Sequence, residues 1–357
     1  MDSTLSCLHW ATVPGRPSST YIQNQKEQQD ELITLCAKLL KEGMVDAIVG
    51  FQDGGELGMS LPCFIDTPND ADKLVWNNRC VPNLSGYLLK KPVKTAIVAK
   101  PCDARAVVSL IKENQLKRDD VYIIGMVCDG MVDDEGRFLP GCADCVVKIP
   151  PVYDVLIGDV KDVAAAPMQL ESAGSLIYKI GSPDNSGEPV ADSNKLLKNE
   201  QHAPDENQCT SDEKWHISSK KQTTHDENKR IFNERFKRFV SEISKCILCF
   251  SCRQACYGCY CPTCFMDRGE PNWQPTSPDM GSKMLYHLVR TMHLAGRCVG
   301  CGACENACAS GVDIRYLIRE VSCFIEETYG YQAGMDLETE PAMLTFKPDD
   351  PEIGFLE

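Results

Sequence analysis

Two short cysteine runs of identical spacing constrain this chain more than any other feature. Both follow the pattern C-x2-C-x2-C-x3-C, in the segments CILCFSCRQAC and CVGCGACENAC. Their members are Cys246, Cys249, Cys252 and Cys256 in the first run, and Cys298, Cys301, Cys304 and Cys308 in the second. The 357-residue chain holds 21 cysteines, an odd number, and its N-terminus has no secretory signal, which disfavours a disulfide framework. Metal ligation by thiolates explains the pattern better.

The spacing of each run is that of bacterial proteins with 4Fe-4S clusters. Three cysteines at two-residue gaps wrap a loop around one face of a cubane, and in two-cluster proteins the fourth cysteine serves the other cluster. We therefore expect one cluster on Cys246, Cys249, Cys252 and Cys308, and a second on Cys298, Cys301, Cys304 and Cys256. The alternative is a zinc-stabilised, non-redox scaffold, since zinc also binds pairs of C-x2-C.

Hydrophobic patterning divides the chain into four parts. The predicted parts are an α/β domain with a small, mostly parallel sheet over 1–180, a polar linker or insertion over 181–228, an α-helical, ferredoxin-like dicluster domain over 229–329, and an extended C-terminal arm over 330–357. The linker is almost free of aliphatic residues, so it cannot offset the entropy of ordering it. The arm is rich in Pro, Asp and Glu and is expected to lie on a partner.

Within these parts, residue patterns predict individual elements. Strands are predicted over 45–51, 94–100 and 121–128, and helices over 27–42, 103–114, 231–245, 282–294 and 312–329. The helix over 103–114 takes Asp103 as its N-cap and joins two of the strands into a parallel βαβ unit.

A second set of cysteines follows these strands. Cys102 lies at a strand–helix turn, Cys128 ends the next strand, and Cys142 and Cys145 form a pair in the following loop. Because α/β proteins bind ligands at the C-terminal ends of parallel strands, these four can close on a third 4Fe-4S cluster. The alternatives are a zinc site, or two core cysteines with a separate loop pair.

Three further cysteines, Cys259, Cys261 and Cys264, follow the first run in GCYCPTC. They are candidates for a further metal site or for redox-active thiols beside a cluster. The second reading gives an alternative function, a cluster-linked thiol/disulfide reductase. No other catalytic residue can be named, because the chain has no Walker loop, nucleophile elbow or paired-histidine zinc motif.

Charge and hydropathy exclude some classes of function. The net charge of −14 argues against a nucleic-acid binder. No apolar run approaches the roughly 20 residues of a membrane span. With no signal peptide recognised, we expect a cytoplasmic location.

At KPCDARAVVSLIK, GMVCDG, CADC and CILCFSCRQACYGCYC, the sequence resembles the beta-subunit family of coenzyme F420 (deazaflavin) hydrogenases and formate dehydrogenases. It is most similar to the branch that carries a dicluster ferredoxin domain and occurs beside heterodisulfide-reductase-like subunits. The resemblance implies that Cys102, Cys128, Cys142 and Cys145 bind the third cluster. It also implies a bound FAD that exchanges hydride with a deazaflavin or with NAD(P)H, and partner subunits of a hydrogenase, formate dehydrogenase or heterodisulfide-reductase-like complex.

The chain offers candidate FAD contacts but no GxGxxG fingerprint. Glycines allow a close approach of backbone to a pyrophosphate, and Lys or Arg can pair with it. The candidates are Gly50, Asp53, Gly54, Gly55, Asn83, Ser85, Tyr87, Lys100 and Arg105. The expected function is therefore an iron–sulfur, flavin-containing electron-transfer subunit of a larger oxidoreductase.

Overall fold

The computed structural model describes residues 19–90, 93–143, 145–158, 225–267, 277–342 and 344–345. The first half contains, in order, α1 (Ser19–Lys41), β1 (Ala47–Gln52), η2 (Gly55–Leu57), β2 (Leu61–Ile65), η3 (Pro68–Lys73), α2 (Ser85–Leu88), β3 (Thr95–Ala99), α3 (Pro101–Lys112), η4 (Arg118–Asp120), β4 (Val121–Met126), α4 (Pro140–Ala143) and β5 (Val155–Ile157). The second half contains α5 (His225–Ser244), α6 (Ser251–Gln254), η6 (Phe265–Asp267), α7 (Met280–His293), α8 (Ala303–Asn306) and α9 (Ile314–Tyr329).

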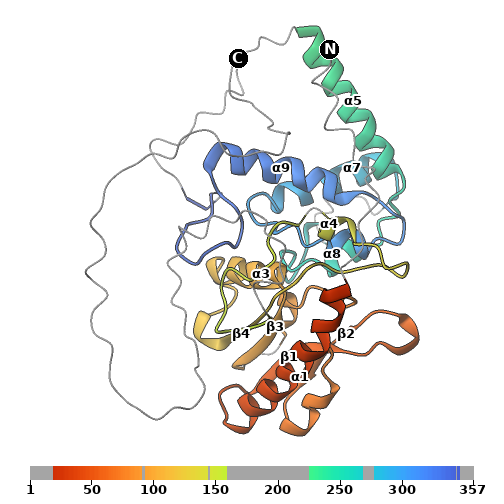
Figure 1. Ribbon diagram of the computed structural model, residues 1–357. Helices are drawn as coiled ribbons and strands as arrows, with labels where there is room; N and C mark the ends of the chain where they lie inside the picture. The colour runs from red at the N-terminus through yellow and green to blue at the C-terminus, as the bar shows by residue number, and fades with distance from the viewer. Residues whose placement is uncertain are drawn as a thin grey trace, which may run out of the picture. The chain divides into compact units, whose positions relative to one another are not determined.

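The first half is built on a five-stranded sheet with the order β2-β1-β3-β4-β5 (Figure 1). The pairs β1–β3, β3–β4 and β4–β5 are parallel, and only the edge strand β2 runs antiparallel to its neighbour β1. The predicted small, mostly parallel α/β sheet is therefore confirmed. Sequence patterning missed β2 and β5, which lie at the two edges.

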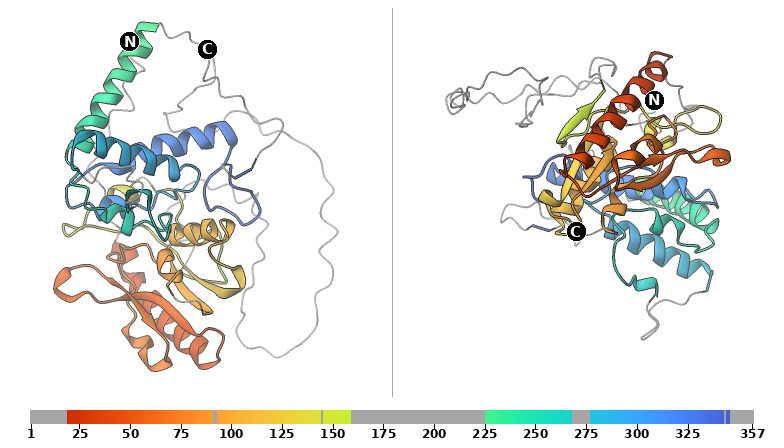
Figure 2. Two further views of the ribbon diagram at one scale, coloured as in Figure 1. Left: turned by 180° about the vertical axis from the view of Figure 1, so that it is seen from behind. Right: turned by 90° about the horizontal axis from the view of Figure 1, so that it is seen from below.

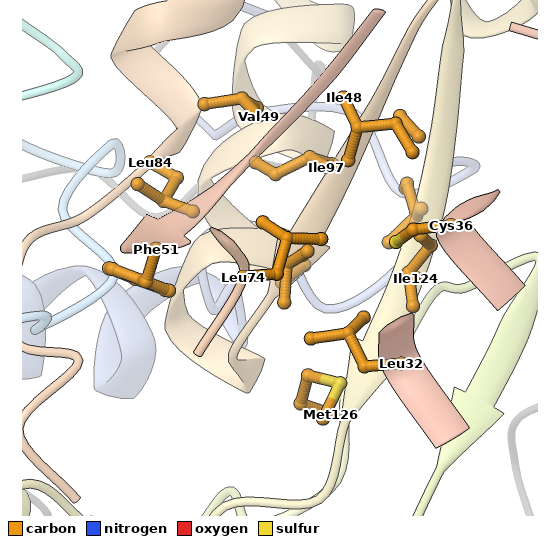
Figure 3. Close-up of a cluster of buried hydrophobic side chains, with 14 of the residues drawn as sticks. Leu32, Cys36, Ile48, Val49, Phe51, Leu74, Leu84, Ile97, Ile124 and Met126 are labelled. Atoms are coloured by element: carbon orange, nitrogen blue, oxygen red, sulfur yellow. The ribbon is translucent and has the colours of Figure 1, made fainter. Parts of the chain in front are cut away.

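The central strands are buried on both faces, which explains why they are continuous apolar runs rather than alternating ones. Helix α1 lies along the sheet (Figure 2). In Figure 3, Leu32 and Cys36 of this helix lie beside Ile124 and Met126 of β4. This core aligns the C-terminal ends of β3 and β4, which Cys102 and Cys128 follow.

Helix α3 begins earlier than predicted, and Asp103 is not its N-cap. The N-cap is Lys100, Pro101 opens the helix, and the Asp103 carboxylate accepts a hydrogen bond from the backbone N–H of Lys100 at 3.0 Å. Proline suits the first helical position because its missing N–H would have no helical partner there. The shift places Cys102 in the first turn of α3.

The second half is helical, and its helices alternate with the cysteine runs as predicted. Phe239 and Ile243 of α5 are buried, whereas Phe236 of the same helix is 45% exposed. Whether these helices form a ferredoxin-like domain stays a prediction. None of the described helices has the length and apolarity needed to cross a membrane.

The described residues 19–158 and 231–345 belong to one compact unit. Ala106 and Leu110 of α3 share a buried cluster with Tyr257, Val299 and Ile325 of the second half. Charged side chains add to this contact: the Arg105 Nε–H donates to the carbonyl oxygen of Ala333 at 3.0 Å. Helix α3 thus connects the sheet to the second half.

The C-terminal segment continues this contact on the same chain. Tyr331 and Ala333 are buried against α3. Gly334 has φ +73°, and a Cβ atom there would lie 2.1 Å from the carbonyl oxygen of Arg105, so only glycine fits. Residues 346–357 of the predicted arm and 181–224 of the predicted linker lie outside the described residues, whereas residues 225–228 of that linker belong to α5.

Candidate functional site

The two cysteine runs adopt the same backbone conformation. Leu248 and Phe250 in the first run have φ of 54° and 60°, and the equivalent Gly300 and Gly302 have φ of 71° and 70°. In each run, the N–H two residues after the first cysteine donates to its sulfur, from Leu248 to Cys246 at 3.3 Å and from Gly300 to Cys298 at 3.4 Å. A four-residue helix then carries the third cysteine, α6 in one case and α8 in the other. The structure therefore repeats a cysteine loop.

One cavity is lined by cysteines from both runs. Cys246, Cys249 and Cys252 come from the first run, and Cys308 comes from the second. Leu248 and Phe250 take left-handed conformations that are unfavourable for residues with a side chain, and these let the loop curve around the cavity. We call this group the first site.

The fourth cysteine of the first run, Cys256, lies near the cysteines of the second run. The thiols of Cys298, Cys301 and Cys304 each interact electrostatically with that of Cys256. Burial raises the pKa of Cys304 to about 12, because a thiolate is poorly solvated there. We call these four residues the second site. Each fourth cysteine thus lies with the opposite run, the grouping expected for crossed ligation.

Four cysteines of the first half line a second cavity. Cys102 comes from α3, Cys128 follows β4, Cys142 lies in α4, and Cys145 lies just beyond it. We call this group the third site. Burial is the main cause of the raised pKa of Cys128, and the nearby Cys142 thiol raises it further.

The third site includes a buried cation. The Lys100 Nζ lies 2.9 Å from an Asp103 carboxylate oxygen and donates to the carbonyl oxygen of Pro82, also at 2.9 Å. Burial would lower the pKa of Lys100, but the Asp103 carboxylate together with the Cys102 and Cys80 thiols outweighs it, and the pKa is raised. Lys100 was a candidate contact for a flavin pyrophosphate; its ammonium group is instead paired inside the protein.

The second and third sites adjoin each other. Cys301 and Asn306 of the second half line the cavity of the third site. A Cβ atom added to Gly141 would lie 3.4 Å from the Cα atom of Gly302, so the loops of the two sites meet backbone to backbone. A methyl group at Gly141 would be in van der Waals contact with this backbone.

Helix α7 supplies three buried polar side chains that sequence patterning missed. The Tyr286 hydroxyl lies 3.3 Å from the Cys252 sulfur, and the Arg290 guanidinium donates to the Cys252 carbonyl oxygen at 3.1 Å. His287 is buried beside them, lines the cavity of the first site, and has no hydrogen-bond partner on Nε2 among the described residues. The sequence could have indicated them only through their spacing on an amphipathic helix. Polar residues at such spacing usually face solvent, so the spacing does not predict their burial.

The three cysteines after the first run do not form a group of their own. Cys259 lies against Cys256 and Arg290, Cys261 is exposed, and Cys264 interacts with Arg253. A hydrogen bond with Cys256 is the main cause of the lowered pKa of Cys259, about 7. Within the part of the chain that the structure describes, no three side chains of His, Cys, Asp or Glu are positioned to hold a single metal ion.

The remaining candidate flavin contacts have internal roles. A Cβ atom at Gly50 would lie 2.5 Å from the Leu74 side chain, and one at Gly54 would lie 2.0 Å from the Met59 carbonyl oxygen. These two glycines are therefore required by packing. Asp53 accepts a hydrogen bond from the exposed Gly55, and Asn83 accepts one from Ser85.

The last two candidates contact other parts of the chain. The Tyr87 ring packs against Phe64 and Lys90, and Arg105 binds the C-terminal segment. The Asn83 amide also donates to the Cys102 carbonyl oxygen at 3.5 Å, so Asn83 and Lys100 both lie at the turn before α3, and FAD binding by the nine residues stays a prediction.

Comparison with known proteins identifies relatives over most of the chain, although no protein-family model matches it. The chain is 25% identical over 354 residues to the F420-dependent formate dehydrogenase subunit beta of Methanocaldococcus jannaschii. This alignment covers 85% of the chain and 91% of the relative. The chain is 24% identical over 359 residues to the F420-dependent formate dehydrogenase 1 subunit beta of Methanococcus maripaludis, covering 85% and 90%. The resemblance predicted from the motifs is confirmed: along most of its length, the chain is similar to beta subunits of F420-dependent formate dehydrogenases.

Proposed function

We propose that this chain is an iron–sulfur electron-transfer subunit of an oxidoreductase complex. The observation that carries the proposal is the grouping of cysteines from distant segments, four at each of three sites, with the fourth residue of each run exchanged. The similarity to beta subunits of formate dehydrogenase, an oxidoreductase, supports the same function.

The proposed ligands are the cysteines of the three sites. The first site offers Cys246, Cys249, Cys252 and Cys308; the second offers Cys298, Cys301, Cys304 and Cys256; the third offers Cys102, Cys128, Cys142 and Cys145. When bound, a 4Fe-4S cluster takes up and releases single electrons. The protein's part is to hold the thiolates, exclude water from them and supply the charges around them.

The contacts between sites support one order of transfer, from the third site through the second to the first. Gly141 and Gly302 bring the third and second sites together, and Cys252 interacts electrostatically with Cys304 across the second and first sites. At the outer end, Cys249 is exposed and the neighbouring Ile247 is 62% exposed. We propose that a partner subunit exchanges electrons with the first site at this surface.

At the other end, we propose that the α/β half exchanges electrons with a hydride carrier. The names of the relatives suggest coenzyme F420 as that carrier and a formate dehydrogenase as the complex. Bound FAD in the α/β half would link the two-electron carrier to the one-electron sites.

The cysteine pattern favours clusters over zinc. Zinc sites commonly use pairs of C-x2-C, whereas each run here carries four cysteines in the spacing of 4Fe-4S proteins. Two complete runs of identical spacing are unusual for zinc, and four cysteines line each of two cavities.

Anaerobic purification followed by assay of iron, acid-labile sulfide, zinc and flavin tests the proposal. About twelve irons and twelve sulfides per chain are expected for three clusters, and one FAD for the hydride end. About eight irons would remove the third site from the proposal, and absence of flavin would remove the hydride step. A colourless protein that contains zinc in place of iron would overturn it.

A further inference from the structure

Arg290 is a buried cation that lies between the first and second sites. Its side chain is 3% exposed, although it extends from the fourth turn of α7. One guanidinium nitrogen donates to the carbonyl oxygen of Cys252, and Nε has no hydrogen-bond partner within the described part of the chain.

The surroundings of this guanidinium are thiols from both runs. It interacts electrostatically with Cys252 of the first site, with Cys256 and Cys304 of the second site, and with Cys259. Burial alone would lower the pKa of Arg290, but these four thiols outweigh it and the pKa is raised. After burial, the largest influences on its pKa are thiols, whereas Arg297 elsewhere is paired with the Glu113 carboxylate.

An unpaired buried cation is costly unless negative charge is placed near it. In the proposed function, that charge comes from the thiolates and from the clusters they hold. Reduction adds a negative charge at each site, and two such charges in a medium of low dielectric repel each other. A cation between the sites lowers the energy of both reduced states.

We propose that Arg290 is the shared counter-charge of the first and second sites and that it sets the potentials at which both are reduced. This inference rests on the proposed function. It assigns to one arginine a role beyond holding the fold: it makes both sites easier to reduce.

The experiment compares wild type with Arg290→Met and Arg290→Lys, all purified anaerobically as the full chain. Iron and sulfide are assayed, and the clusters are titrated with EPR detection to obtain midpoint potentials. Lys283→Met is the matched control, because Lys283 lies on the same helix but donates outward to the Ser244 carbonyl oxygen. It removes the same charge without touching a cysteine.

We expect Arg290→Met to shift the potentials of both sites to more negative values. Arg290→Lys, which keeps the charge, and Lys283→Met should stay near wild type. If Arg290→Met holds too little iron to titrate, retention of iron and of near-wild-type potentials by Arg290→Lys supports the same conclusion.

Two results would overturn the inference. One is a fully loaded Arg290→Met protein with unchanged potentials. The other is equal loss of iron from Arg290→Met and Arg290→Lys, because that would assign the effect to hydrogen-bond geometry rather than charge. Wild type without iron would instead refute the proposed function itself, so the two failures are distinguishable.

Discussion

The Glu113 carboxylate, just after α3, accepts two hydrogen bonds from the Arg297 guanidinium. The Nε–Oε1 distance is 2.5 Å and the Nη2–Oε2 distance is 2.6 Å. Arg297 immediately precedes the first cysteine of the second run, and Tyr260 donates its hydroxyl to the same carboxylate at 2.7 Å. This ion pair therefore connects the sheet-bearing half to the loop of the second site.

Removing one partner should weaken that connection. We expect Glu113→Gln to lower the free energy of unfolding by about 1–3 kcal/mol, because Glu113 is nearly buried and Arg297 is left without its acid. Denaturant unfolding of the anaerobically purified protein measures this. A double-mutant cycle with Arg297→Met isolates the pair, and a coupling energy near zero would mean that the contact contributes nothing.

Crossed ligation makes a prediction about cysteine variants. If Cys308 completes the first site, Cys308→Ser should lose or alter the same cluster EPR signal as Cys246→Ser. Cys256→Ser should match Cys298→Ser instead. The expected loss is about four of twelve irons in each case. Pairing of Cys308→Ser with Cys298→Ser would mean that each run holds its own cluster.

The C-terminal segment should depend on Gly334. We expect Gly334→Ala to destabilise the protein by more than about 2 kcal/mol, because the new methyl group clashes with the Arg105 backbone in addition to the cost of a positive φ. Gly311→Ala is the control: φ is +61° but the space around it is open, so only about 1–2 kcal/mol is expected. Equal destabilisation of both variants in thermal unfolding would show that the clash is relieved.

Removal of the Lys100 ammonium group should lower the stability of the α/β half. Lys100→Met leaves the fully buried Asp103 carboxylate without its cation, which costs about 3–5 kcal/mol. The measurement is denaturant unfolding, with Lys100→Met/Asp103→Asn as the compensating variant. Recovery of stability in the double variant is expected, whereas a single variant as stable as wild type would rule out a structural role for the pair.

The sequence predicted the elements whose formation depends on residues that are neighbours in the chain. Unbroken apolar runs predicted β1, β3 and β4, whereas the cluster ligands expected from cysteine spacing and from the family resemblance stay a prediction. The edge strands were missed for identifiable reasons: β5 has only three residues, and β2 carries Pro62 in a segment whose pairing with β1 depends on a distant partner.

The surroundings of the sites required the structure. Nothing in the spacing of Tyr286 and Arg290 distinguishes a polar face in solvent from one that contacts buried cysteines. Likewise, Gly50 and Gly54 look like phosphate-binding glycines in the sequence, whereas side-chain and backbone crowding explains both. Such crowding depends on residues distant in the chain.

The repeated cysteine loop has one further consequence. At the position where the second run has Gly302, open to the backbone of Gly141, the first run has Phe250, whose ring packs edge-on against Tyr286 at 5.1 Å and lies under the Arg253 guanidinium. The two cysteine loops therefore share a backbone conformation but differ in the groups that cover them. The loop with Gly302 contacts a neighbouring loop, whereas the loop with Phe250 is covered at the same point by Tyr286 and Arg253, so one motif used twice meets two different surroundings.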